Sequence, residues 1–245
     1  MMSTRARVLC MLVACAGLLG LTALTEAVAA RGGSPPTCPS FSSSNFHHST
    51  RVDNSYFPLT AGDLYTYNGN RKRAPVQDYI YVTHNTPTIA GVRTVEVRDR
   101  GWESGVLIED TLDWYAQDDS GNVWYFGEFT TQLPAGTHDG SWTAGVDGAQ
   151  PGYIMEGAGR AVGDTYCQEN ATGIAQDVGQ IVSLTASRSV PYGTFAGNVV
   201  QTKDYSLIEP HSEYKFYGPG VGLLEAIALN GGNEDLQLYT VQHNQ

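Results

Sequence analysis

Carboxylates and arginines gather between residues 96 and 113, and this stretch carries the sequence's clearest candidate chemistry. If Ser104-Gly105 forms a two-residue hairpin turn, Glu96 faces Asp113 across two antiparallel strands. A carboxylate pair in a cleft is what acid–base cleavage of a glycosidic bond uses. If the protein is an enzyme, its candidate catalytic residues are therefore Glu96, Glu109 and Asp113.

The same turn gives these carboxylates two arginine neighbours, Arg98 and Arg100. This composition also fits a solvated outer face on which the arginines form salt bridges with the carboxylates. A slip of one residue in the turn would abolish the pairing, because side chains alternate between the two faces of a strand.

A long glycine-rich segment from Pro134 to Met155 joins the two halves of the chain. Long loops on rigid scaffolds often carry binding residues. We expect His138 and Trp142 to contact a ligand, with Trp142 as a stacking platform. Arg98 and His211 are the other candidate binding residues. The alternative is a plain connector whose tryptophan caps the core.

The elements that must position these residues are strands. Stretches rich in β-branched and aromatic residues alternate with glycine turns, and helical periodicity is missing after residue 30. Gly62-Asp63 recurs as Gly163-Asp164, and strand-like and glycine-rich stretches follow each copy in similar order. The sequence thus predicts an all-β fold of two tandem related antiparallel meanders forming a sandwich or barrel. The expected organisation is a signal peptide (1–30), a flexible Ser- and Pro-rich linker (31–53), a first β unit (54–133), a connecting loop (134–160) and a second β unit (161–245).

The first thirty residues have the pattern of a secretory signal. Arg5 and Arg7 precede an apolar run from Val8 to Leu24, and small residues follow at Ala27 and Ala29. We therefore expect a secreted or periplasmic protein, released by cleavage of the signal peptide.

Cleavage leaves two of the four cysteines, Cys38 and Cys167. An even pair in an exported protein favours a disulfide. The bridge would hold the linker against the second Gly-Asp strand.

Composition and missing motifs exclude several function classes. Without the signal the chain has 12 basic and 24 acidic residues, a balance that repels nucleic acid and anionic lipid. No later stretch is long and apolar enough for a membrane helix. The nucleophile-elbow, zinc-hydrolase and phosphate-loop motifs are missing, and the segment 117–122 suits a hairpin turn better than a calcium loop. We expect no cofactor and no metal.

The stretch from Glu109 to Glu128, together with "GVDGAQPG" and "YGPGVGLLE", resembles a family of secreted bacterial proteins of unassigned activity. The resemblance covers most of the chain after Tyr56 and implies export and a β fold. It transfers no catalytic residue. Members of that family tend to lack a cysteine at the position of Cys167, so the disulfide is expected to be particular to this chain.

These observations favour an exported β-protein that binds a small or carbohydrate-like molecule in a cleft between its two β units. One alternative is a secreted carbohydrate-active enzyme, a lyase or hydrolase that uses the paired carboxylates. A second alternative is a structural or interaction protein of the cell envelope.

Overall fold

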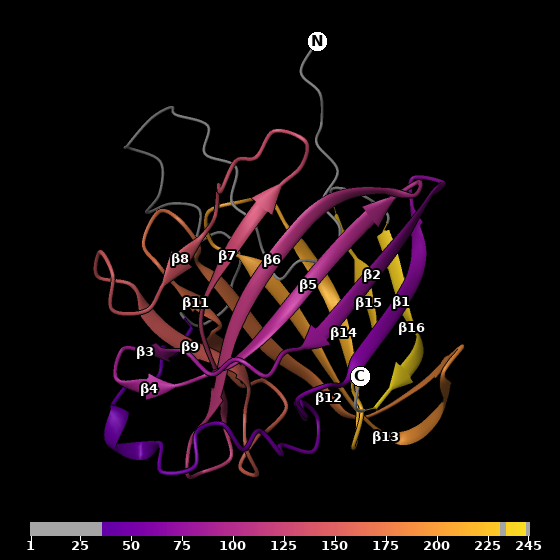
Figure 1. Cartoon of the computed structure of the whole chain (residues 1–245). Helices are drawn as coiled ribbons and strands as arrows, with labels where there is room; N and C mark the ends of the chain where they lie inside the picture. The colour runs from indigo at the N-terminus through magenta and orange to yellow at the C-terminus, as the bar shows by residue number, and fades with distance from the viewer. Residues whose placement is uncertain (1–35, 231–233, 244–245) are drawn as a thin grey trace.

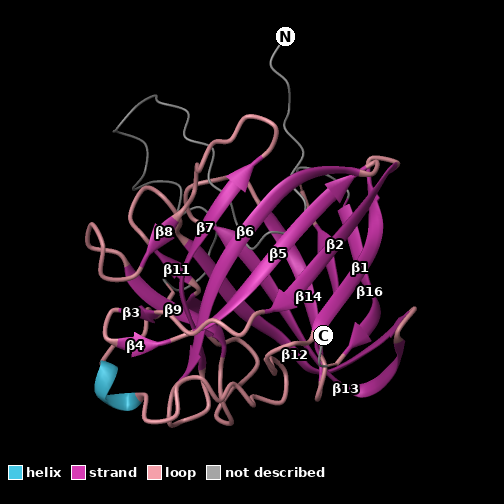
Figure 2. Ribbon diagram, viewed as in Figure 1, coloured by secondary structure: helices cyan, strands magenta, loops and turns pink. Residues whose placement is uncertain are grey.

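The computed structural model describes residues 36–230 and 234–243, and nearly all of its regular structure is β-strand (Figure 2). The single helical element in that part of the chain is a short 3-10 turn, η1 (Ser43–Asn45). The expected signal peptide lies outside the described residues. No helix within them has the length and apolar character to cross a membrane. The all-β prediction is confirmed.

Two runs of antiparallel strands build the main sheet. The first contains β1 (Leu64–Arg71), β2 (Ala74–Val82), β5 (Val95–Glu103), β6 (Val106–Gln117), β7 (Val123–Gln132), β8 (Trp142–Thr143) and β9 (Gln150–Met155). The second contains β10 (Thr165–Cys167), β11 (Glu169–Asn170), β12 (Asp177–Val190), β13 (Gly193–Ser206), β14 (Ser212–Gly218), β15 (Gly222–Ala228) and β16 (Glu234–Gln242). A separate small sheet contains β3 (Thr88–Ile89) and β4 (Val92–Arg93).

The two runs join into one nearly closed, barrel-shaped sheet (Figure 1). β16 pairs with β1 on one side. On the other side β10 pairs with β12 and the adjoining β11 pairs with β9, so this short segment bridges the remaining gap. Because side chains alternate along each strand, the inward residues of both runs share one interior. Of the two predicted arrangements, the structure has the barrel.

The two Gly-Asp turns have the same backbone hydrogen bonds. The amide of Gly62 donates to the carbonyl of Val82 at 2.8 Å, and the amide of Gly163 donates to the carbonyl of Ile181 at 2.9 Å. Both glycines have positive φ, 92° and 99°, which is the conformation that glycine tolerates best. The origin of the two units by duplication stays a prediction.

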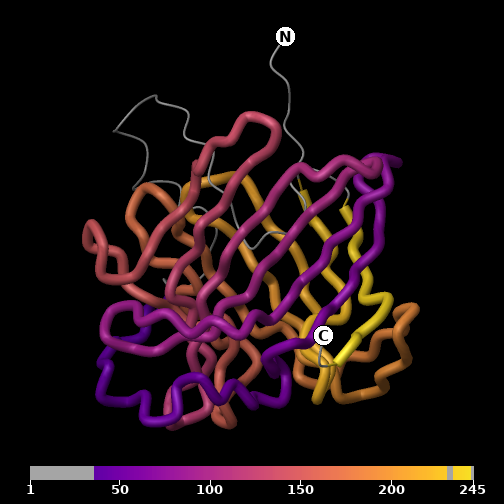
Figure 3. Tube along the Cα trace, viewed as in Figure 1, coloured from indigo at the N-terminus to yellow at the C-terminus, as the bar shows by residue number. Residues whose placement is uncertain are grey.

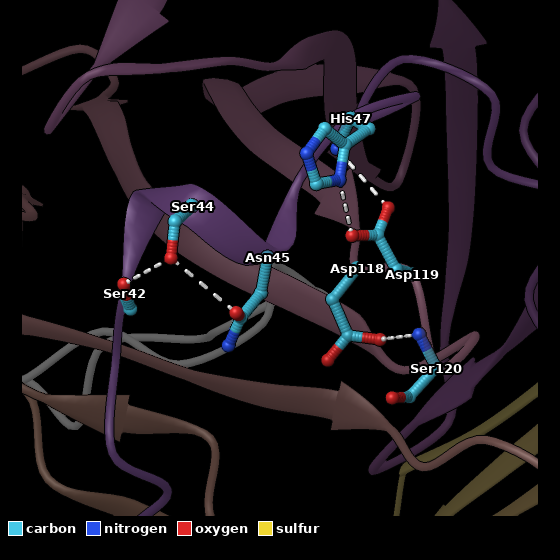
Figure 4. Close-up of polar contacts among 7 residues, drawn as sticks. All are labelled: Ser42, Ser44, Asn45, His47, Asp118, Asp119 and Ser120. Carbon is cyan, nitrogen blue, oxygen red and sulfur yellow. Dashed lines mark hydrogen bonds and ion pairs between the residues drawn. The ribbon is translucent and has the colours of Figure 1, made fainter.

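The segment 36–53, for which composition predicted a flexible linker, is fixed to the barrel at several points. Cys38 and Cys167 form the predicted disulfide, which is confirmed. Further along, the Nδ1 atom of His47 lies 2.6 Å from the Asp119 carboxylate at the β6–β7 turn (Figure 4). Figure 3 shows this indigo segment running along one end of the barrel.

Aromatic packing explains why this segment is ordered. Phe41 and Phe46 pack against Trp124 and Phe126 of β7, with ring centroids 5.6 to 5.9 Å apart. Trp124 and Phe126 are buried beneath them. Composition missed this because two phenylalanines among many serines decide the packing. The expected loop 134–160 also differs, since β8 and β9 within it extend the sheet.

The β5–β6 hairpin forms at Ser104-Gly105 as expected, with positive φ at both residues. A bulge between Gly101 and Trp102 then shifts the pairing by one residue. Asp113 therefore pairs with Val97, and Glu96 pairs with Trp114. The predicted Glu96–Asp113 pair is wrong, because this shift places the two carboxylates on opposite faces of the sheet.

The disulfide closes a long loop, so its loss should destabilise the fold. We expect Cys38→Ser and the double variant Cys38→Ser/Cys167→Ser each to lose about 4 kcal/mol of unfolding free energy, because the unfolded chain regains entropy. Urea unfolding measures this, with the exposed Ser40→Ala as control. A loss below about 1 kcal/mol in both variants would show that the bridge contributes little.

Candidate functional site

A cavity of about 60 Å³ lies inside the barrel, lined by residues from both runs of strands. Its walls are mainly apolar and aromatic, and three charged residues contribute to its lining: Asp99 on β5, Asp113 on β6 and Lys215 on β14. The other lining residues are Phe57, Pro58, Leu59, Tyr65, Tyr67, Ile80, Val97, Tyr115, Val221, Gly222 and Leu223. Few convergent polar groups in an apolar hollow are typical of a small-molecule site.

Two surface segments form one side of the cavity. Pro58 and Leu59 precede β1, and Val221 lies in the turn between β14 and β15. These three side chains are half-buried, whereas the charged groups are buried. The amide of Gly220 donates a 2.6 Å hydrogen bond to the carbonyl of Ser55, which holds the two segments together. We therefore place the mouth of the cavity at these segments.

Of the described residues that line the cavity, Lys215 alone carries a positive charge. It is 1% exposed, and its Nζ atom lies 2.9 Å from Glu213 and 3.1 Å from Asp204. Burial alone would lower the pKa of Lys215, but these two carboxylates raise it well above its ordinary value. Burial opposes ionisation of Glu213, yet Lys215 lowers the pKa of Glu213 to about 2. Lys215 is thus already neutralised by protein carboxylates.

Many more carboxyl groups than cations are buried around this cavity. Each interacts with a neighbour in a series from β2 round to β13, and Lys215 then links Asp204 to Glu213 on β14. The members are Asp78, Asp99, Glu109, Asp113, Glu128, Glu169, Asp177, Asp204 and Glu213. Within the described residues, no group of three His, Cys, Asp or Glu side chains has the arrangement of a metal site.

Burial raises the pKa of several of these carboxyl groups. It raises the pKa of Asp113 to about 7, although a 2.6 Å hydrogen bond from the Tyr125 hydroxyl favours the ionised form. Burial, and then the charge of Asp78, raise the pKa of Asp99 well above its ordinary value. Two close carboxyl groups in a dry interior resist joint ionisation, and burial likewise raises the pKa of Asp78 well above its ordinary value.

The predicted catalytic residues do not lie together in the structure. Asp113 and Glu109 face the interior, and Asp113 lines the cavity. Glu96 is on the outer face, where it accepts a 2.8 Å hydrogen bond from Asn85. Arg98 is also outside and holds Asp110 through two hydrogen bonds, at 2.8 and 2.5 Å.

The predicted ligand-binding residues do not meet at the cavity either. His138 is exposed and stacks on Phe129 at 4.5 Å. Trp142 lines a second hollow, of about 200 Å³, but it is 5% exposed and packs edge-on against Tyr125. It therefore offers no open stacking face. His211 lies near Glu213, and that carboxylate raises the pKa of His211.

Sequence reasoning missed Asp99 and Lys215, although signals for both exist. Side chains alternate along β5, so Asp99 lies on the same face as the core residues Val95 and Val97 and points inward. If the two units are aligned as the sequence predicts, Lys215 falls at the position of Asp113, 102 residues earlier.

Comparisons with known proteins give similar structures at low sequence identity. No family model matches the chain, and no curated protein matches it. A protein described as exported, with a YmcC-like fold, from Bacteroides fragilis superposes with a TM-score of 0.46 and 12% identity over 77% of this chain and 99% of that one. A protein described as a lipoprotein from Parabacteroides distasonis gives a TM-score of 0.44 and 16% identity, with the same coverage.

The raised pKa values predict an unusual pH dependence of stability. Asp113, Asp177 and Glu234 each have a folded pKa of about 7, above their unfolded values of 3.8 or 4.5. The folded state therefore holds extra protons at pH 5 and releases them as the pH rises towards 7. The unfolding free energy should fall by about 2 kcal/mol or more between pH 5 and pH 7.

Urea unfolding at a series of pH values measures this slope. Asp113→Asn should make the slope shallower, while Asp110→Asn, on the outer face of the same strand, should leave it unchanged. The lowered pKa of Glu213 acts in the opposite direction, but only below about pH 4.5. A stability that rises from pH 5 to pH 7 would contradict the assignment of protonated interior carboxyl groups.

Proposed function

We propose that this protein is an exported binding protein that holds a small, partly apolar molecule in the cavity between its two meanders. The observation that carries the proposal is the cavity itself, with apolar walls and buried polar groups contributed by both units. Export is supported by the signal-like first thirty residues and by the Cys38–Cys167 disulfide.

The walls of the cavity suit an apolar group. Leu223 and Val97 are buried there, and Tyr115 adds an aromatic surface. Burial of a ligand's apolar surface contributes about 25 cal/mol for each Å² removed from water. The buried polar groups would then fix the orientation of the ligand.

The volume limits the part of a ligand that fits inside. A dry cavity of about 150 Å³ takes up benzene. The present cavity, at about 60 Å³, is less than half that size. It therefore suits a small head group or the end of a chain, with the rest of the molecule lying across Pro58, Leu59 and Val221 at the mouth.

The alternative of a carbohydrate-active enzyme has less support, because its proposed catalytic residues Glu96 and Asp113 are on opposite faces of the sheet. A role in the cell envelope without a ligand stays the other alternative.

Incubation with polysaccharides, followed by an assay for reducing ends and unsaturated products, is the control for turnover. Turnover abolished by Asp113→Asn would favour the enzyme over the binding protein.

Thermal-shift measurements with four octyl compounds test the binding site. The compounds are octan-1-ol, octylamine, octanoate and octyl glucoside, which share a chain and differ in head group. At about one hundred times its dissociation constant, a ligand stabilises the folded state by about 2.7 kcal/mol, or a Tm increase of about 5 °C or more for a chain of this size. We expect this increase with at least one compound.

Val221→Trp should block the mouth and abolish the increase. The matched control is Val162→Trp, at an exposed valine in the second Gly-Asp turn, outside the cavity. It should bind as the wild type does. No increase with any compound, or an increase that persists in Val221→Trp, would contradict this location of the site.

A further inference from the structure

The charge around the cavity is one-sided. Asp99 and Asp113 line it on one side, and both are buried, at 6% and 3% exposure. Lys215 is the cation in the lining, and it lies within 3.1 Å of both Asp204 and Glu213. These two carboxylates already balance its charge, so Lys215 is not available to neutralise Asp99 and Asp113.

Asp78 points to the same imbalance. It is fully buried next to Asp99, and no cation forms an ion pair with it in the part of the chain that the structure describes, although the backbone amide of Tyr79 favours its ionised form. Its carboxyl group and that of Asp99 bond only when one of them carries a proton. A buried carboxylate without a cationic partner is costly to ionise. The interior thus has a deficit of positive charge.

We propose that the ligand of this cavity carries a primary amine, whose ammonium group binds between Asp99 and Asp113 while its apolar part lies against the walls and the mouth. This proposal rests on the binding function proposed above and names the chemical class of the ligand. An ammonium group would supply three donors and one positive charge beside Asp99 and Asp113, which Lys215 does not neutralise. An anionic head group would instead meet the buried carboxyl groups.

The size of the cavity agrees with this head group. A primary ammonium group is compact, and the cavity of about 60 Å³ holds only a few heavy atoms. The tyrosines Tyr65, Tyr67 and Tyr115 also line it, and aromatic rings attract cations through their faces. The apolar residues at the mouth favour an amine with a hydrocarbon part over a fully hydrated ion.

Binding of an amine should release a proton. Without ligand, Asp113 has a pKa of about 7, so below that pH it is mostly neutral. As the ammonium group enters, the Asp113 proton leaves to solvent, and the charge of the site is conserved. The groups that face Asp113 and influence this step are Asp99 on β5, Glu109 on β6, Tyr125 and Glu128 on β7, Glu169 on β11 and Lys215 on β14, and Asp78 on β2 interacts in turn with Asp99 and Glu109.

Titration calorimetry with octylamine and octan-1-ol tests the proposal, because the two compounds share a chain and differ in charge. At pH 8 octylamine should bind at least about tenfold more tightly than octan-1-ol, as one charge-assisted pair is worth about 1.5 kcal/mol or more. Its affinity should weaken by up to about tenfold for each pH unit below 7. Repeating the titration at pH 6 in buffers of different ionisation enthalpy should show nearly one proton released for each octylamine bound.

Matched variants separate this charge effect from general packing. Asp113→Asn keeps the shape of the side chain and can still accept a hydrogen bond from Tyr125, so the fold should persist. In this variant the preference for octylamine should fall below about threefold, and proton release should be lost. Asp110→Asn removes a carboxylate from the outer face of the same strand and should behave as the wild type does.

The outcomes distinguish the two proposals. Equal, pH-independent binding of octylamine and octan-1-ol, blocked by Val221→Trp, would overturn the amine assignment and leave the binding function intact. A preference for octylamine that persists in Asp113→Asn would also overturn it. Binding of none of the octyl compounds would overturn both proposals.

Discussion

Burying carboxyl groups without enough cations is the constraint on which the rest of this structure depends. A buried, unpaired charge is costly, so a protein neutralises it with a partner or with a proton. This barrel uses both means. Lys215 lowers the pKa of Glu213 to about 2, whereas no cation among the described residues pairs with Asp113, and burial raises its pKa to about 7. One interior therefore contains carboxyl groups with raised and with lowered pKa values, and the cavity is lined by Asp113 and by Lys215, the partner of Glu213.

The arrangement of the strands produces this contrast. The two runs of strands contribute residues to one interior, and Asp113 from the first run and Lys215 from the second both line the cavity. The bulge beside Gly101 is equally decisive, because it sets Asp113 opposite Val97 and so keeps it inside. Without this one-residue shift, the same carboxylate would pair with Glu96 at the predicted register.

Much of the fold could be predicted from the sequence, because its signals are local. Alternating β-branched and aromatic residues predicted the strands, and the count of cysteines predicted the Cys38–Cys167 bridge. The hairpin at Ser104-Gly105 was also expected, and it forms. The bulge that follows this turn has no comparable local signal. The sequence also did not predict that the segment 36–53 packs against the barrel, because this packing depends on contacts with β7, which is distant in the sequence.

The candidate site was predicted only in part. Asp113 and Glu109 do face the interior, but His138 and Arg98 are on the outside. His138 and Trp142 were predicted from their residue types in a glycine-rich loop. Which residues line a site inside a barrel depends instead on the strand register. A lysine within an aromatic strand, such as Lys215, looks like a surface residue until both of its partner carboxylates are placed beside it.

The most direct test of this account is a carboxyl-carbon NMR titration of Asp113, assigned by comparison with Asp113→Asn. In the free protein the signal should titrate near pH 7, because burial favours the neutral acid. With saturating octylamine the midpoint should move at least one unit lower, because the ammonium group stabilises the ionised form. A midpoint near 4 in the free protein, unchanged by octylamine, would contradict both the neutral interior and the ligand that it is proposed to hold.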